Sequence, residues 1–97
     1  MVRWTLRSIS DLEEVGSYIA RDNPDAANRW IAKLRARAQA ASRLPLAGRI
    51  VPEFAEHEIR EVFERAYRIV YRVETGSIVV LTVQHGRRLL CGDDLGT

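Results

Sequence analysis

The side chains best suited to chemistry lie in the second half of the chain. They are arginines and one histidine: Arg60, Arg68, Arg72, His85, Arg87 and Arg88. A guanidinium group holds a phosphate or a carboxylate through two parallel hydrogen bonds, and an imidazole exchanges a proton near pH 7. Such a set is suited to gripping a phosphate or contacting a large acidic target. The same residues also fit a plainer interpretation, as solvated strand positions paired with Glu58, Glu61 and Glu64.

Other kinds of site are not indicated. The histidines, His57 and His85, have no spaced set of cysteines or carboxylates beside them, so neither a metal site nor a cofactor is predicted. The glycines are scattered rather than gathered in a phosphate-binding loop, and no serine or cysteine lies in a nucleophile motif. Cys91 is the single cysteine, and we expect a free, inert thiol.

Length and composition set the frame for these residues. The 97 residues suffice for one small domain, which we expect at 1–90, followed by a flexible tail at 91–97. The 46% of hydrophobic and 29% of charged residues are typical of a soluble globular protein. No apolar run is long enough to cross a membrane and no signal peptide is evident, so we expect a cytoplasmic protein without a membrane partner. The net charge of +2 does not by itself imply nucleic-acid binding.

A β-hairpin must position most of the arginines. Residues 66–73 and 78–85 are rich in β-branched and aromatic side chains, contain no proline, and flank a turn that includes Gly76. Alternation along the first arm places Arg68 and Arg72 on the face opposite Tyr67. Residues 59–63 indicate a preceding strand, so a three-stranded meander brings Arg60, Arg68 and His85 into one neighbourhood. Parity leaves open whether His85 lies at the rim or faces the other way.

The first half of the chain indicates a strand and two helices. Apolar and polar residues alternate over 2–7, which predicts a strand. A helix follows, capped by Ser8 or by Ser10 in a capping box with Glu13, and it ends near Asp22. Gly16 within this helix indicates that another backbone passes close by. Its apolar stripe consists of Ile9, Leu12, Val15 and Ile19.

A second, longer helix begins after Asn23 and ends near Leu44 and Pro45. The short linker between the helices predicts an antiparallel helical hairpin. The predicted fold class is therefore α+β: a strand, the helical hairpin, then a three-stranded antiparallel meander that the first strand joins. We expect the helices to cover one face of the sheet and to leave the arginine-bearing face uncovered.

Several segments together resemble the bacterial RelE/ParE toxin superfamily over residues 3–88. In the sheet they are Tyr67-Arg68-Ile69-Val70-Tyr71-Arg72-Val73, Ile78-Val79-Val80-Leu81 and Val83-Gln84-His85-Gly86-Arg87-Arg88; in the first half they are Asp11-Leu12, Tyr18-Ile19, Pro24-Asp25-Ala26-Ala27 and Gly48-Arg49. The resemblance implies the same order of strand, two helices and antiparallel sheet. It also implies the toxin of a type II toxin–antitoxin pair.

The superfamily divides by target. ParE-type members, which this sequence resembles better in its helices and at His85-Gly86-Arg87-Arg88, inhibit DNA gyrase through a protein contact. The implied target contacts are the six arginine and histidine residues named first. A ParD-like antitoxin would lie along the helical hairpin, with candidate contacts at Leu12, Val15, Ile19, Trp30, Leu34 and Arg35.

Two alternatives remain open. RelE-type members cut messenger RNA on the ribosome, and the resemblance would then have Arg68 grip the scissile phosphate while His85 handles a proton. Gly86 stands where some ribonuclease members carry tyrosine, the tail has no tyrosine, and the usual lysines of that site are missing. The other alternative is a decayed toxin that only binds its antitoxin.

Overall fold

The computed structural model describes residues 1–86 and 90–95. Its strands are β1 (Val2–Trp4), β2 (Arg49–Ile50), β3 (Ile59–Glu64), β4 (Tyr67–Glu74) and β5 (Ser77–His85). Its helices are α1 (Leu6–Ala20), α2 (Pro24–Arg43) and the short 3-10 helices η1 (Pro45–Ala47) and η2 (Gly92–Leu95). The predicted α+β class and the helical hairpin are confirmed. None of the helices in this part of the chain is long and apolar enough to cross a membrane.

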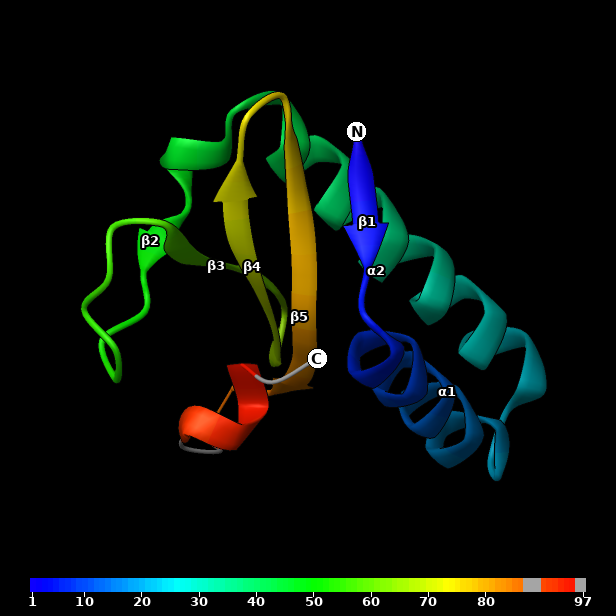
Figure 1. Ribbon diagram of the computed structural model, residues 1–97. Helices are drawn as coiled ribbons and strands as arrows, with labels where there is room; N and C mark the ends of the chain where they lie inside the picture. Colours follow the sequence, from blue (N-terminus) through cyan, green and yellow to red (C-terminus); the bar gives the residue numbers. More distant parts are fainter. Residues whose placement is uncertain (87–89, 96–97) are drawn as a thin grey trace.

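The strands form one sheet in the order β1-β5-β4-β3-β2 (Figure 1). The β3-β4-β5 meander is antiparallel, as predicted from the turns. The first strand joins this sheet parallel to β5, with Val2 opposite Ile78. The last long strand of the chain, β5, therefore lies between β1 and β4.

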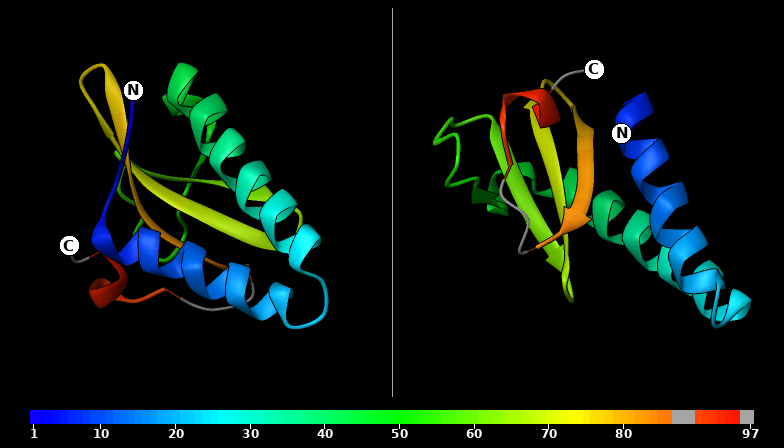
Figure 2. Two further views of the ribbon diagram at one scale, coloured as in Figure 1. Left: turned by 90° about the vertical axis from the view of Figure 1, so that its right-hand side faces the viewer. Right: turned by 90° about the horizontal axis from the view of Figure 1, so that it is seen from below.

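Both long helices cover one face of the sheet, and the main core lies between them (Figure 2). Leu34 and Ala38 of α2 are completely buried in one cluster that also contains Ile69 and Tyr71 of β4. Burying a side chain of this size contributes about 1.5–3 kcal/mol, so this layer holds the hairpin on the sheet.

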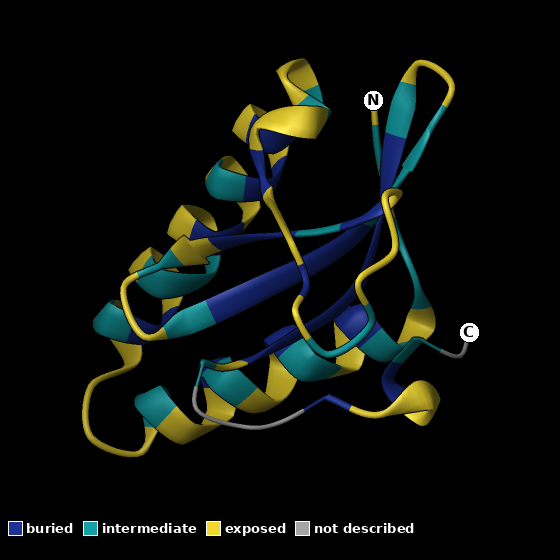
Figure 3. Ribbon diagram, turned by 90° about the vertical axis from the view of Figure 1, so that its left-hand side faces the viewer, coloured by how far each residue is buried: buried dark blue, intermediate teal, exposed yellow. Residues whose placement is uncertain are grey.

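The opposite face of the sheet is covered too, which corrects the expectation that it stays bare. A second apolar cluster joins Val70 of β4 and Leu81 of β5 to Val51 and Leu90 from outside the sheet. Figure 3 shows the long strands dark blue from this side as well. The predicted tail at 91–97 includes η2, whose Asp94 is only 1% exposed. The covering layer therefore consists of the segment after β2 and the segment around η2.

The N-terminal strand is shorter than predicted, and α1 begins earlier. Thr5 is the N-cap: its hydroxyl accepts a hydrogen bond from the backbone N–H of Ser8 at 3.0 Å, so the predicted caps at Ser8 and Ser10 are wrong. Leu6 continued the alternating pattern, but it lies in α1 and is 83% exposed. The alternation of apolar and polar residues alone could not distinguish the exposed Leu6 from a leucine buried in a strand.

Gly16 marks a close contact, although not the predicted one. A Cβ at this position would lie 2.7 Å from Cδ1 of Ile31, so a side chain of α2, rather than a backbone, approaches the glycine. The absence of a side chain at Gly16 allows the two helices to pack closely.

A β-bulge in β5 changes which way its last residues face. Val70 pairs with Thr82 and Tyr71 pairs with Val80, so Leu81 is an extra residue on β5. The simple alternation of side chains is therefore reset after Leu81. As a result Val83 packs in the same core as Ile78 and Val80 instead of facing the opposite side.

Candidate functional site

Arg68 lies in a buried ionic cluster rather than on an open surface. It is 4% exposed, and its Nε donates to Oε1 of Glu61 at 2.5 Å. Its two terminal nitrogens donate to the two carboxylate oxygens of Glu53 at 2.9 and 2.6 Å. Arg49 joins the cluster from β2, with its Nε donating to Oε2 of Glu61 at 2.6 Å. We call these four residues the Arg68 cluster.

The Arg68 cluster stabilises the charged forms of its members. Hydrogen bonds from Arg68 lower the pKa of Glu53 to about 2, against the opposing effect of burial. Hydrogen bonds to Glu53 in turn raise the pKa of Arg68, with Glu61 contributing in the same direction. Both guanidinium edges of Arg68 thus face carboxylates, which occupy the geometry that a phosphate would need.

The other predicted arginines lie in different surroundings. Arg60 donates from Nε to the carbonyl of His57 at 2.8 Å and from Nη1 to the carbonyls of Leu46 and Gly48, both at 3.1 Å. It therefore fastens the connection between α2 and β3. Arg72 is half-buried opposite Ile59. Arg87 and Arg88 lie outside the described residues.

His85 belongs to a row of aromatic rings on the helix-covered face. Its ring meets that of Tyr67 edge to face, with centroids 6.2 Å apart. Tyr67 meets Trp30 of α2 in the same way at 5.5 Å. Tyr67 and His85 are direct cross-strand partners, whereas Arg68 pairs with Gln84 and points to the other face. The prediction that Arg60, Arg68 and His85 share one neighbourhood is therefore wrong.

The helical residues predicted to contact a partner divide by burial. Leu12 is 3% exposed and Leu34 is completely buried, so both belong to the core and neither offers a surface. Val15, Ile19 and Trp30 are half-buried, and Arg35 is exposed. Leu12 and Val15 of the predicted stripe therefore mark the side of α1 that packs in the core, whereas Ile9 of the same stripe is 41% exposed.

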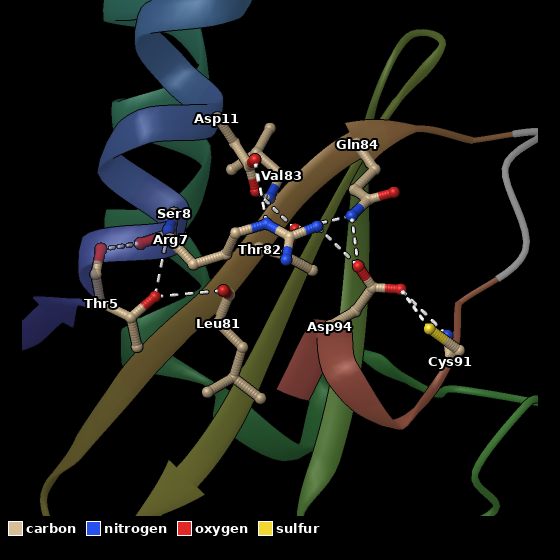
Figure 4. A network of polar contacts seen from close by, with 10 residues as sticks. All are labelled: Thr5, Arg7, Ser8, Asp11, Leu81, Thr82, Val83, Gln84, Cys91 and Asp94. Carbon is tan, nitrogen blue, oxygen red and sulfur yellow. Dashed lines mark hydrogen bonds and ion pairs between the residues drawn. The ribbon is translucent and has the colours of Figure 1, made fainter. Parts of the chain in front are cut away.

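A second polar network, which the sequence analysis missed, ties α1 to β5 and η2 (Figure 4). Arg7 donates to Asp94 at 2.6 Å and, more loosely, to Asp11 at 3.3 Å. Asp94 also accepts from the side-chain amide of Gln84 at 3.1 Å. Burial opposes the charge of Arg7, but Asp11 and Asp94 outweigh it and raise the pKa of Arg7.

Side chains from the start of α1 complete the edge of β5 beyond the end of β1. The Thr5 hydroxyl donates to the carbonyl of Leu81 at 3.1 Å. Asp11 accepts from the hydroxyl of Thr82 at 2.5 Å and from the backbone N–H of Val83 at 3.0 Å. These groups follow directly after the bulge, so the helix satisfies strand atoms that β1 is too short to reach.

One partner of Arg68 was anticipated from the sequence, because Glu61 is among the carboxylates that the plainer interpretation pairs with the arginines. In the β3–β4 hairpin Glu61 lies opposite Val70 and Arg68 lies opposite Phe63, so Glu61 and Arg68 are diagonal neighbours on the same face. Glu53 and Asp94 come from connections outside the strands, where no periodicity places a side chain. Among the described residues, no group of three or more His, Cys, Asp or Glu is arranged to hold a metal ion.

Comparisons with known proteins agree on the class of this chain. Residues 2–90 match the family model described as the ParE toxin of the type II toxin–antitoxin system parDE. A Sinorhizobium fredii protein named "putative toxin Y4kP" is 34% identical over 90% of this chain and 88% of its own length. The toxin RelE2 of Caulobacter vibrioides is 33% identical over 91% of this chain and 97% of its own.

A solved structure shares the fold. The chromosomal ParDE system of P. aeruginosa contains a chain that superimposes with a TM-score of 0.69 and 19% identity. The match covers 87% of this chain and 92% of that one. At this identity the likeness concerns the arrangement of helices and sheet alone.

Proposed function

Because the chain belongs to the ParE toxin family of type II toxin–antitoxin systems, we propose that it halts bacterial growth by inhibiting DNA gyrase and that a cognate ParD-like antitoxin neutralises it. Under this proposal the chain acts in the cytoplasm by a protein contact, without a cofactor. Its effect would then require a folded surface rather than a set of catalytic groups.

The ion pairs of Arg68 are the observation that favours inhibition of gyrase over cleavage of RNA in this proposal. A ribonuclease site at this position would need Arg68 and His85 to reach one phosphate. Arg68 instead meets Glu53 and Glu61 on one face of the sheet, while His85 lies beside Tyr67 on the other. Separating Arg68 from two carboxylates costs several kcal/mol, which an RNA phosphate would have to offset. A protein contact makes no such demand.

Induced expression in bacteria tests the proposal. We expect DNA synthesis to stop before protein synthesis, measured as incorporation of labelled thymidine and methionine. Purified chain should inhibit supercoiling by gyrase in vitro and cause cleavage complexes to accumulate. Adding the product of the neighbouring gene first should abolish both effects. Normal supercoiling at a large excess of chain would remove gyrase as the target, and harmless expression would leave a decayed toxin that only binds its partner.

Ribosome-dependent cleavage of messenger RNA is the second candidate, and the relative named RelE2 favours it. Primer extension on translated messages would then show new cuts. Under this alternative His85→Ala should abolish the cuts, because His85 would transfer a proton. His57→Ala is the matched control, since His57 is also an exposed histidine but lies in the connection before β3. The absence of cuts in the wild type removes this candidate.

A further inference from the structure

A pocket of about 380 Å³ lies between α1 and the ends of β4 and β5. Its lining combines carboxylates with rings: Asp11, Glu14, Val15, Tyr18, Tyr67 and His85. A second hollow of about 510 Å³ continues along α1 and shares Glu14 and Tyr18 with the first. The pocket faces the ends of β4 and β5, whereas the second hollow lies along the surface of α1 itself, and we call the two together the α1 groove.

The charge of the α1 groove is opposite to that of the whole chain. The chain carries +2, but Glu13 and Glu14 line the groove, and Arg21 is the only lysine or arginine among the described residues that line it. Asp11 shares Arg7 with Asp94. Glu14 is exposed and makes no ion pair with any other described residue within 4.0 Å. Glu14 therefore supplies a net negative charge at the pocket.

The rings beside Glu14 suit a cation rather than an apolar group alone. Tyr18 is 68% exposed, so its ring offers a large aromatic surface beside Glu14. Tyr67 presents a second ring on the other side of the pocket. A cation between a carboxylate and aromatic faces is stabilised by the opposite charge and by the quadrupoles of the rings. A neutral side chain would gain only the apolar contact.

We propose that the α1 groove binds a segment of the antitoxin and that the pocket receives a lysine or arginine side chain from it. The inference rests on the proposed function for the existence of this partner. A polypeptide is favoured over a small cation because the second hollow continues from the pocket along α1 and gives room for a chain on both sides of the inserted residue. Although this chain has a positive net charge, the pocket would therefore favour a positively charged residue of the partner.

Charge reversal at Glu14 tests the inference. The probe is the purified product of the gene beside the one encoding this chain, titrated by calorimetry against the full chain. Glu14→Arg should weaken binding by about tenfold or more at low salt, with a smaller loss at high salt because the pair is exposed. Glu56→Arg is the matched control: Glu56 is exposed outside the α1 groove, and the substitution changes net charge equally. It should change the affinity by less than about twofold.

Tyr18 provides an independent readout. Tyr18→Ala should weaken binding severalfold, whereas Tyr18→Phe keeps the ring and should bind as the wild type does. Thermal unfolding of each variant confirms that it is folded. Each lysine and arginine of the partner is then changed to glutamate, and one of these changes should restore binding to Glu14→Arg.

The outcomes separate the two proposals. Failure of the wild-type chain to bind this partner overturns the proposed antitoxin. Tight wild-type binding with Glu14→Arg equal to Glu56→Arg overturns the inference about the pocket alone. So does the absence of any restoring change in the partner.

Discussion

Glu53 shows how much one carboxylate outside a strand can determine. It closes a bidentate pair with Arg68 and accepts the backbone N–H of Leu90 at 3.1 Å. One side chain therefore joins the sheet, the segment after β2 and the segment before η2. The arginine that a sequence reader would assign to phosphate chemistry serves here to hold three parts of the chain together.

The pKa of Glu53 predicts an acid-sensitive stability. Its folded-state value of about 2 lies below the ordinary 4.5, so its stabilisation is complete above about pH 4.5 and is lost as the pH falls toward 2. A shift of this size corresponds to about 3 kcal/mol. We expect Glu53→Gln to lower the free energy of unfolding in urea by about 2–3 kcal/mol at pH 7, and the difference from wild type to shrink below pH 4.5.

Glu56→Gln is the control for this measurement, because Glu56 is exposed in the same connection. It should leave both the stability and its pH dependence close to those of the wild type. Parallel pH curves for wild type and Glu53→Gln would contradict the lowered pKa of Glu53, and coincident curves would mean that the pair with Arg68 contributes no net stability.

At the scale of elements, the start of α1 does two tasks with one residue. Thr5 caps the helix through Ser8 and also donates to the carbonyl of Leu81 in β5. Thr5→Ala should therefore lower the free energy of unfolding by about 1–2 kcal/mol. Ser10→Ala should be nearly neutral, because Ser10 is exposed within the helix. Chemical denaturation of the two variants distinguishes the cap at Thr5 from the predicted capping box at Ser10. Equal losses of unfolding free energy in the two variants would contradict the cap at Thr5.

Gly48 is needed for packing rather than for backbone freedom. Its φ of −68° is accessible to any residue, but a Cβ there would overlap Tyr71 Oη and lie 3.0 Å from the carbonyl of Glu61. Tyr71 is completely buried and donates to the carbonyl of Pro45 at 2.6 Å, so it cannot move aside. We expect Gly48→Ala to cost about 1–3 kcal/mol.

Gly92→Ala is the matched control for Gly48→Ala, because a Cβ at Gly92 meets nothing within 4 Å. Thermal unfolding should place Gly92→Ala within a degree or two of the wild type and Gly48→Ala well below it. An unchanged melting temperature for Gly48→Ala would show that Tyr71 can move away from a side chain at position 48.

The meander and the helical hairpin could be predicted because their signals are local. Turn residues around Gly76 and the Asn23–Pro24 boundary fix both hairpins within a few residues. The face of the sheet on which His85 lies could not be predicted. It depends on the β-bulge at Leu81, which is visible in the pairing of β4 with β5 but not in the sequence. Arg68 was placed on the correct face, but the carboxylate of Glu53 comes from a connection without periodicity.

At the scale of the whole molecule, the sheet is enclosed on both faces. The helices cover one face, while the segment after β2 and η2 cover the other. Buried Asp94 fixes η2 to this arrangement through Arg7 and Gln84. The resemblance to a known superfamily anticipated the first layer of this enclosure and gave no indication of the second.

Asp94→Ala should loosen one face of the molecule. It leaves Arg7 and the Gln84 amide without Asp94, at a cost of about 2–4 kcal/mol. Hydrogen exchange should quicken in η2 and at Leu81, with less change in α2. Asp93→Ala in the same short helix is the control, since Asp93 is exposed and its loss should be nearly silent. Equal exchange in both variants would contradict a structural role for Asp94.

The position of β5 between β1 and β4 also has a consequence for synthesis on the ribosome. β1 and β4 both pair with this strand, and β1 is made about 75 residues before it, so a nascent chain can build the helical hairpin but not the sheet that covers its apolar side. A chain released early would expose the faces of α1 and α2 that carry Leu12 and Leu34. Interrupted translation should therefore yield fragments that quality-control proteases recognise, and no partly active protein.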